Sequence, residues 1–97
     1  MKRTTKSRRR GRYPNRLWSY RHRLGLSQRR VAELVGYLTQ SDISRFERGE
    51  RLPSLVMAMK IEIVYGPPIS FLFPDLYGRL REAIRAKADE ARSRTSV

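Results

Sequence analysis

The side chains with the clearest chemical potential lie near the middle of the chain. They are Gln40, Ser41, Ser44 and Arg45. If this stretch is helical, their spacing puts them on its outward side, opposite Ile43 and Phe46. Amide, hydroxyl and guanidinium groups match the hydrogen-bonding edges of DNA bases, whereas a merely solvated face more often carries Glu and Lys. The stretch therefore favours contact with base edges.

Other kinds of chemistry lack a residue set. The 97 residues contain no cysteine and a single histidine, His22, so a disulfide framework or a thiolate metal site is excluded and one histidine cannot hold zinc by itself. Four acidic residues are predicted to form a solvated helix face; they are Asp75, Glu82, Asp89 and Glu90. No nucleophile or glycine-rich phosphate loop accompanies them. We expect no enzymatic activity, no catalytic residue, no metal and no cofactor.

Glycine and proline divide the chain into short segments. They stand at Gly25, Gly36, Gly49, Pro53, Gly66-Pro67-Pro68 and Pro74. Between them the apolar residues recur at intervals near 3.6 rather than 2, which predicts an all-α fold. The predicted helices span about residues 15–23, 27–36, 39–49, 54–65, 69–73 and 75–89. The chain after Asp89 is polar, and we expect it to fray.

The helix that carries the polar side chains is predicted to begin after Thr39. Thr39 and Asp42 have the spacing of a capping box. The preceding helix begins at Ser27, a good N-cap, and Gly36 closes it, while Gly49 ends the helix after Thr39. Two short helices joined by a tight turn are typical of a helix-turn-helix, in which the second helix enters the major groove of DNA.

A strongly basic segment precedes these helices. The formal net charge of the chain is +13, and every charged residue before Tyr13 is basic. The arginines closest to the predicted domain are Arg8, Arg9, Arg10 and Arg12. This segment has no large apolar side chain after Met1, so it cannot bury enough surface to offset its ordering entropy. We predict a disordered basic arm over residues 1–12, whose arginines contact DNA phosphates.

Several motifs in the predicted domain, residues 13–73, match the pattern of a known family. They are Arg21, Gly25-Leu26-Ser27-Gln28, Val31-Ala32, Gly36, Ile43-Ser44-Arg45, Phe46-Glu47-Arg48-Gly49 and Pro53-Ser54-Leu55. In these residues the chain resembles the Xre family, the lambda-repressor and Cro-like helix-turn-helix proteins. The resemblance covers about residues 15–73, and its motifs are specific in combination rather than singly. It implies a lambda-repressor-like domain of five helices, followed here by an extra helix.

The resemblance also implies roles for single residues. It places DNA contacts at Gln28, Thr39, Gln40, Ser41, Ser44, Arg45 and Arg48. Gln28 would donate to a phosphate at a helix N-terminus, where an anion is favoured. Arg45 would reach a guanine or a phosphate, and Arg48 the DNA backbone. Arg21 and Glu47 would form a structural ion pair that ties the first helix to the end of the third.

The chain departs from the family pattern in three places. Tyr37 lengthens the turn by one residue, so the list of base contacts can shift by one position. Glu62 and Ile63 reverse the usual order of a small apolar and then a polar residue. The basic arm and the C-terminal helix, residues 74–97, lie outside the resemblance.

Together these observations predict a transcriptional regulator that binds specific double-stranded DNA, acting as a repressor. The helix over residues 54–65 has more apolar residues than one side needs. We expect part of this surface to pack on the last helix, and the remainder, with that helix, to form a homodimer interface. A two-fold dimer would recognise an inverted-repeat operator. No run approaches a membrane span, so we expect a cytoplasmic, nucleoid-associated protein of a bacterium or phage.

Two alternatives stay open at this point. The first is an antitoxin that neutralises a toxin protein and autoregulates its operon. The second is an RNA- or ribosome-associated protein, which the arginine-rich arm suggests. A neighbouring toxin gene would favour the first alternative, and tighter binding to structured RNA than to duplex DNA would favour the second.

Overall fold

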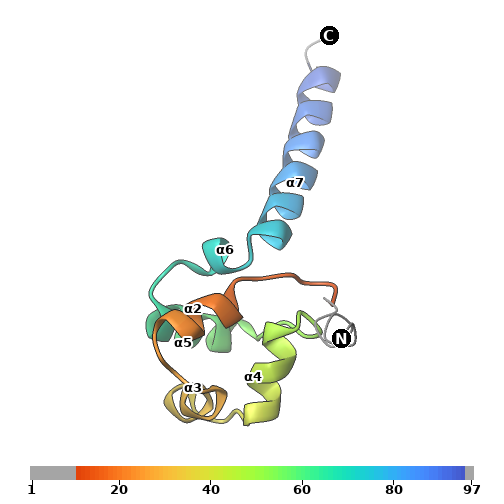
Figure 1. Cartoon of the computed structure of the whole chain (residues 1–97). Coiled ribbons are helices and arrows are strands. Elements are labelled where there is room, and N and C mark those ends of the chain that lie inside the picture. The colour runs from red at the N-terminus through yellow and green to blue at the C-terminus, as the bar shows by residue number, and fades with distance from the viewer. Residues whose placement is uncertain (1–10, 96–97) are drawn as a thin grey trace, which may run out of the picture.

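Six helices and no strand make up residues 11–95, the part of the chain that the computed structural model describes (Figure 1). The helices are α2 (Leu17–Arg23), α3 (Gln28–Val35), α4 (Gln40–Glu47), α5 (Leu55–Tyr65), α6 (Ile69–Leu72) and α7 (Pro74–Thr95). The predicted all-α fold, with five helices followed by an additional C-terminal helix, is confirmed.

Short polar side chains start the helices where the sequence indicated. The Ser27 hydroxyl accepts a hydrogen bond from the Arg30 amide at 3.0 Å at the start of α3. At the start of α4, the Asp42 amide donates to the Thr39 hydroxyl at 3.2 Å, and the Thr39 amide donates to the Asp42 carboxylate at 2.8 Å. This reciprocal capping box satisfies amides that have no partner inside the helix. The turn before α4 is thereby tied directly to its first residues.

Helices α2 to α6 enclose one apolar core. Its buried side chains are Leu17, Val31, Ala32, Val35, Ile43, Phe46, Ile61, Tyr65, Leu72 and Phe73. Helix α3 packs mainly against α4 and α5, and α6 packs against α5 and α7. Because α4 buries Ile43 and Phe46, its polar side is turned away from the core.

The residues that lead into α2 form an N-terminal strap, Gly11–Arg16, across the end of α4. The Gly11 amide donates to the Arg48 carbonyl at 2.8 Å, and the Tyr13 amide donates to the Gly49 carbonyl at 3.0 Å. The prediction that the arm extends to residue 12 is therefore wrong, because backbone hydrogen bonds hold this segment on the domain. Residues 1–10, with the predicted contacts Arg8, Arg9 and Arg10, lie outside the described residues.

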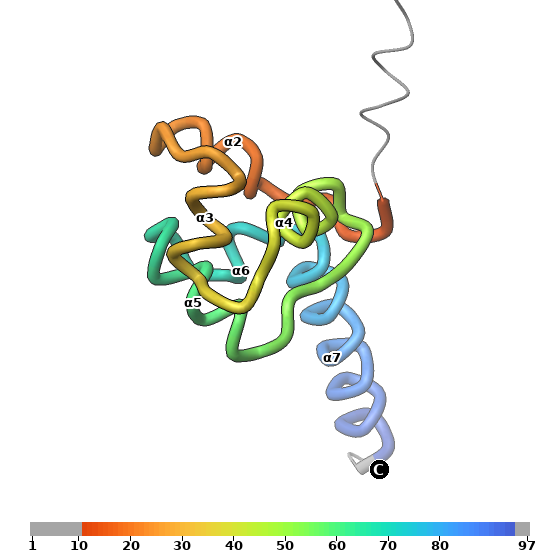
Figure 2. The backbone as a smooth tube through the Cα atoms, turned by 90° about the horizontal axis from the view of Figure 1, so that it is seen from below, coloured from red at the N-terminus to blue at the C-terminus, as the bar shows by residue number. Residues whose placement is uncertain are grey.

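Helix α7 projects from the domain instead of covering it. Figures 1 and 2 both show it running away from the α3–α4 pair, and the molecule measures 57 × 34 × 21 Å along its principal axes. Only its first turns pack on the rest of the chain, where Leu76 is partly buried against the core. Helix α7 contacts mainly α6 rather than α5, and Leu55, Met59 and Ile63 of α5 remain exposed.

Fraying was expected after Asp89, but the helical conformation of α7 continues as far as Thr95. Two ion pairs, each between residues about one helical turn apart, support this end of the helix. Arg92 lies 2.7 Å from Asp89, and Arg94 lies 3.9 Å from Glu90. Such pairs stabilise an exposed helix by a few tenths of a kcal/mol each, about 0.3.

Candidate nucleic-acid interface

The turn between α3 and α4 accommodates its extra residue through an unusual backbone. Gly36 ends α3 with φ of 82°, and Tyr37 follows with φ of 59°. A left-handed conformation costs a residue with a side chain about 1 kcal/mol or more. The Tyr37 side chain is almost fully exposed. Lys60 of α5 braces the turn, because its Nζ donates to the Val35 carbonyl at 3.1 Å and lies 5.5 Å from the centre of the Tyr37 ring.

The extra residue leaves the rotation of α4 as predicted from its apolar residues. Ile43 and Phe46 are both buried, so the helix can present only its other side to a ligand. The outward residues that precede Arg48 are Gln40, Ser41, Ser44 and Arg45, with Thr39 exposed at the N-cap. All are exposed except Ser44, which is half-buried. Neutral donors and acceptors thus lie at the N-terminal half of α4 and arginines at its C-terminal half.

A buried hydrogen-bond cluster holds α4 against α2 and α3. Both Nε and Nη2 of Arg21 donate to the carboxylate of Glu47, the latter at 3.1 Å, and Arg21 Nη1 donates to the Leu26 carbonyl at 2.9 Å. Gln28 Nε2 donates to the same carboxylate at 3.0 Å. The hydrogen bond from Arg21 to Glu47 raises the pKa of the guanidinium, and burial together with Glu47 raises that of the nearby Tyr65 hydroxyl.

This cluster also explains the position of Gln28 at the first turn of α3. One amide hydrogen of Gln28 is used on Glu47, and its half-buried side chain is oriented by that bond. A side-chain amide has a second hydrogen to donate. The free backbone amides of the helix N-terminus lie beside it and favour an anion. Gln28 and the start of α3 therefore form a preorganised donor group.

Arg48 makes three hydrogen bonds to neighbouring side chains of the protein. Its Nε and Nη2 donate to the Glu50 carboxylate at 2.9 and 3.2 Å, and its Nη1 donates to the Ser44 hydroxyl at 2.6 Å. The hydrogen bond from Arg48 lowers the pKa of the Glu50 carboxyl. A phosphate that binds Arg48 must compete with Glu50, a residue that sequence reasoning missed. The only sequence signal was an acidic residue two positions after a predicted DNA contact.

Asp42 links the cap of α4 to two arginines. Its carboxylate accepts a hydrogen bond from Arg51 Nη1 at 2.9 Å and lies 4.0 Å from Arg45 Nη1. The backbone hydrogen bond from Thr39, followed by that from Arg51, lowers the pKa of the Asp42 carboxyl. Asp42 therefore stays ionised at neutral pH, and it offsets part of the positive charge along the side of α4.

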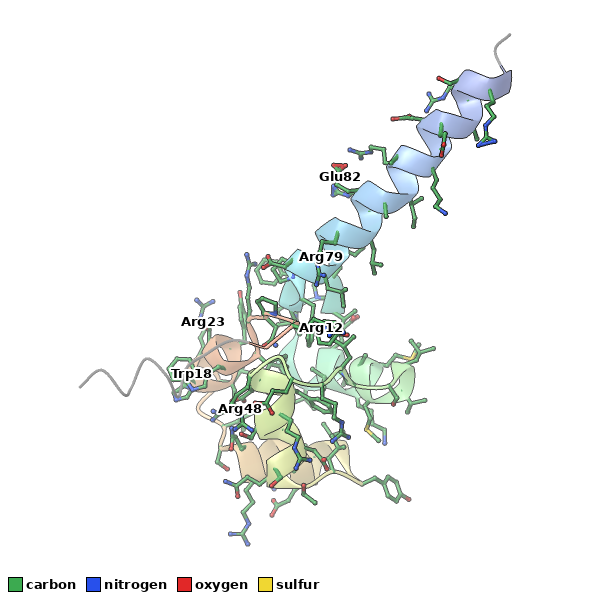
Figure 3. All side chains as sticks on the ribbon, turned by 90° about the vertical axis from the view of Figure 1, so that its right-hand side faces the viewer. Arg12, Trp18, Arg23, Arg48, Arg79 and Glu82 are labelled. Atoms are coloured by element: carbon green, nitrogen blue, oxygen red, sulfur yellow. The ribbon has the colours of Figure 1, made fainter. Side chains whose placement is uncertain are left out.

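The strap places Arg12 at the C-terminal end of α4, between the residues bonded to Arg48 and Gly49. Arg12 is exposed, and its carbonyl accepts a hydrogen bond from Arg79 Nη2 at 3.4 Å (Figure 3). Asn15, which sequence reasoning also missed, fixes the strap by donating from Nδ2 to the Tyr13 and Phe46 carbonyls at 2.9 and 2.8 Å. An asparagine just before a helix is a usual capping signal, but its bond to α4 is not visible in the sequence.

Comparison with known families supplies the deciding observation. A family model described as helix-turn-helix matches residues 19–72, more than half of the chain. The chain belongs to the Xre-type, lambda-repressor-like helix-turn-helix family. The match to the Xre-type domain runs from α2 to α6 and includes neither the strap nor α7. Searches among curated proteins and solved structures returned no match.

Membership in the Xre-type family makes the protein a DNA-binding transcriptional regulator in general terms. Within residues 11–95, no helix combines the length and apolar character needed to cross a membrane. The same residues contain no group of His, Cys, Asp and Glu side chains placed to hold a metal ion.

Proposed function

We propose that the protein is a sequence-specific repressor that reads double-stranded DNA with the outward side of α4. The observation that carries this proposal is the Glu47 cluster, which locks α4 to α2 and α3 while leaving the polar side of α4 exposed. A reading element must be held rigidly if its hydrogen bonds are to discriminate between bases. Because the proposed ligand is DNA, we also place the protein with the nucleoid.

The outward residues of α4, together with Gln28 of α3, differ in the part of the DNA that each would contact. Gln40 and Ser41, at the end that would enter the groove, supply donors and acceptors to base edges. Arg45 reaches a guanine edge or a phosphate. Gln28 and Arg48, at the two flanks, donate to phosphates and set the register of the helix on the duplex. Each good bidentate base contact would contribute about 1–3 kcal/mol of discrimination.

We further propose that two copies associate through α5. Leu55, Met59 and Ile63 follow each other at four-residue intervals and are 73, 57 and 79 % exposed. The departure from the family pattern at Glu62 and Ile63 supports this proposal. Glu62 accepts a hydrogen bond from the Ile69 amide at 2.9 Å and so caps α6, which leaves the apolar Ile63 on the outside. A two-fold dimer would bind an inverted repeat.

The proposal is tested by in vitro selection from random duplex DNA with the purified protein at about physiological salt, where non-specific binding is suppressed. Enrichment of an inverted repeat, lost in Gln40→Ala and Arg45→Ala, is the expected result. Arg85→Ala, which removes an exposed arginine of α7, serves as the control and should keep the enrichment. Tight binding at low salt without enrichment would contradict the proposal and direct attention to a protein or RNA ligand.

Repression itself needs a separate measurement. The selected site is placed over a promoter, and the transcript is quantified with and without the protein. A lower transcript level supports a repressor, and a higher level an activator. An antitoxin is the second candidate function, favoured by the exposed apolar side chains of α7, because neutralising a toxin requires a surface for a protein. A toxin encoded beside this chain and inhibited by it would support that candidate.

A further inference from the structure

From Tyr77 onward, α7 carries an apolar stripe whose large side chains are about half or more exposed in the described chain. Tyr77, Leu80 and Ile84 are 49, 54 and 69 % exposed, and their spacing of three and four residues aligns them on one face. Two small residues, Ala88 and Ala91, continue the face at the same spacing. An amphipathic helix of this kind is only marginally stable in water unless its apolar face is covered.

The charges beside the stripe have one sign. Arg81 and Arg85 border one edge, and Lys87 borders the other, as 3.6 residues per turn requires. Arg81 also lies over the Tyr77 ring, 5.6 Å from its centre. The acidic residues of α7 beyond its first turn lie on the opposite half of the helix; they are Glu82, Asp89 and Glu90. The stripe is therefore an apolar seam with basic edges.

This arrangement disfavours a second copy of α7 as the covering element. In a two-helix pair the residues beside the seam face those of the other helix, whether the helices are parallel or antiparallel. Two α7 helices would oppose Arg81 and Arg85 to basic residues in either orientation. Like charges directly opposed destabilise such a pair. Helix α5 carries both a basic and an acidic residue, Lys60 and Glu62, so like-charge repulsion does not oppose the pairing of two copies through α5.

A membrane surface fits the stripe less well than a protein does. A helix that lies on a membrane presents a broad apolar face rich in Trp, Phe and Leu. The α7 face has only three large apolar side chains and narrows to alanine at Ala88 and Ala91. Small residues allow a second helix to approach closely, and they match the large side chains of a partner.

We propose that the α7 stripe binds an acidic amphipathic helix of a partner protein. Apolar residues of the partner would pack on Leu80 and Ile84, and its Glu or Asp residues would face the basic edges of the stripe. Because α7 points away from α3 and α4 (Figure 1), the partner could bind while α4 is on DNA. The proposal does not depend on the DNA-binding function.

The probe is a fluorescein-labelled helical peptide with leucine at the apolar heptad positions and glutamate at the flanking ones. The comparison peptide carries lysine in place of glutamate. Fluorescence anisotropy with the full-length protein at about 0.15 M salt limits non-specific attraction. The glutamate peptide should bind at least about tenfold tighter than the lysine peptide. Equal binding of the two peptides would overturn the proposal.

Paired variants separate the stripe from the general positive charge of the protein. Leu80→Asp with Ile84→Asp should abolish binding, and Arg81→Glu with Arg85→Glu should reverse the preference between the peptides. Arg29→Glu with Arg30→Glu makes the same change in net charge on exposed residues of α3 and should leave binding within about twofold. An equal loss in this α3 variant would overturn the proposal, since the peptide would then follow net charge alone.

Two further measurements address the other occupants. Analytical ultracentrifugation should show the same assembly state for the wild type and the Leu80→Asp, Ile84→Asp variant. An assembly that this variant dissolves would assign the stripe to a second copy. Sedimentation with vesicles of phosphatidylserine and phosphatidylcholine should not depend on the same two residues. Vesicle binding lost in the variant would assign the stripe to a membrane surface, and either result would overturn the proposal.

Discussion

Gly11 and Gly49 lie back to back, and neither position has room for a Cβ atom. A Cβ on Gly11 would be 2.5 Å from the Gly49 carbonyl oxygen, and one on Gly49 would be 2.5 Å from the Tyr13 carbonyl oxygen. The hydrogen bonds from Gly11 to Arg48 and from Tyr13 to Gly49 lie at the same crossing. The chain that enters the domain is thus attached to the end of the proposed reading helix.

Replacing either glycine should loosen this crossing. Gly49→Ala also forces a side chain onto a residue with φ of 73°, so we expect it to lower the free energy of unfolding by about 2 kcal/mol or more. Gly11→Ala should cost less, because the strap can lift from the domain. Chemical denaturation measures both. Gly78→Ala, at an α7 position open to solvent, is the control and should not destabilise the protein.

Removal of residues 1–10 should weaken DNA binding without changing its sequence preference. The segment contains only basic charged residues, and each phosphate contact contributes a slope of about −0.9 in log K against log salt. Titrations of the selected operator at several salt concentrations should therefore show a flatter dependence for the truncated protein. An unchanged slope would mean that the segment makes no phosphate contacts. A loss of sequence preference would mean that it reads bases.

Glu50→Gln should strengthen DNA binding. The change removes the carboxylate that accepts two hydrogen bonds from Arg48, so the guanidinium no longer has to leave an ionic partner to reach a phosphate. We expect an affinity gain of about threefold, within the range for an exposed ion pair. Glu82→Gln on α7 makes the same charge change at an exposed position, and operator titrations should show no comparable gain for it.

The capping box of α4 should make stability depend on pH in the acid range. The pKa of Asp42 in the folded protein lies below its ordinary value, mainly because of the Thr39 amide. Its contribution is therefore fully present above the ordinary value of about 4. It is lost as the pH falls through the lowered pKa. Asp42→Asn should be less stable than wild type at pH 7, and denaturation curves should converge in strong acid.

Breaking the Glu47 cluster should cost more stability than any change on the outward side of α4. Glu47→Ala leaves the buried Arg21 guanidinium without its carboxylate, for which we expect a loss of about 3 kcal/mol. The same change frees Gln28, so operator affinity should also fall under conditions where the variant is folded. Gln40→Ala, on the exposed side, should leave the denaturation midpoint unchanged. Equal losses for both variants would contradict the structural role of Glu47.

Most of the features that were predicted for the domain are helix starts and ends, which depend on residues close together in the chain. The caps at Ser27 and Thr39 and the stops at Gly36 and Gly49 depend on neighbours within one helical turn, so their spacing alone predicts them. The pairing of Arg21 with Glu47 spans distant residues. It was predicted from the family resemblance, because nothing local indicates it.

Apart from the local pair of Arg48 and Glu50, the features that sequence reasoning missed join separate segments of the chain or leave a segment without a neighbour. The strap on α4, the bond from Asn15 to Phe46 and the capping of α6 by Glu62 each require the folded arrangement. The direction of α7 is of the same kind, because its periodic apolar residues predict a helix but not the surface that it covers. Secondary structure follows from local energetics, whereas the course of the strap and the exposure of α5 and α7 depend on which distant surfaces fit together.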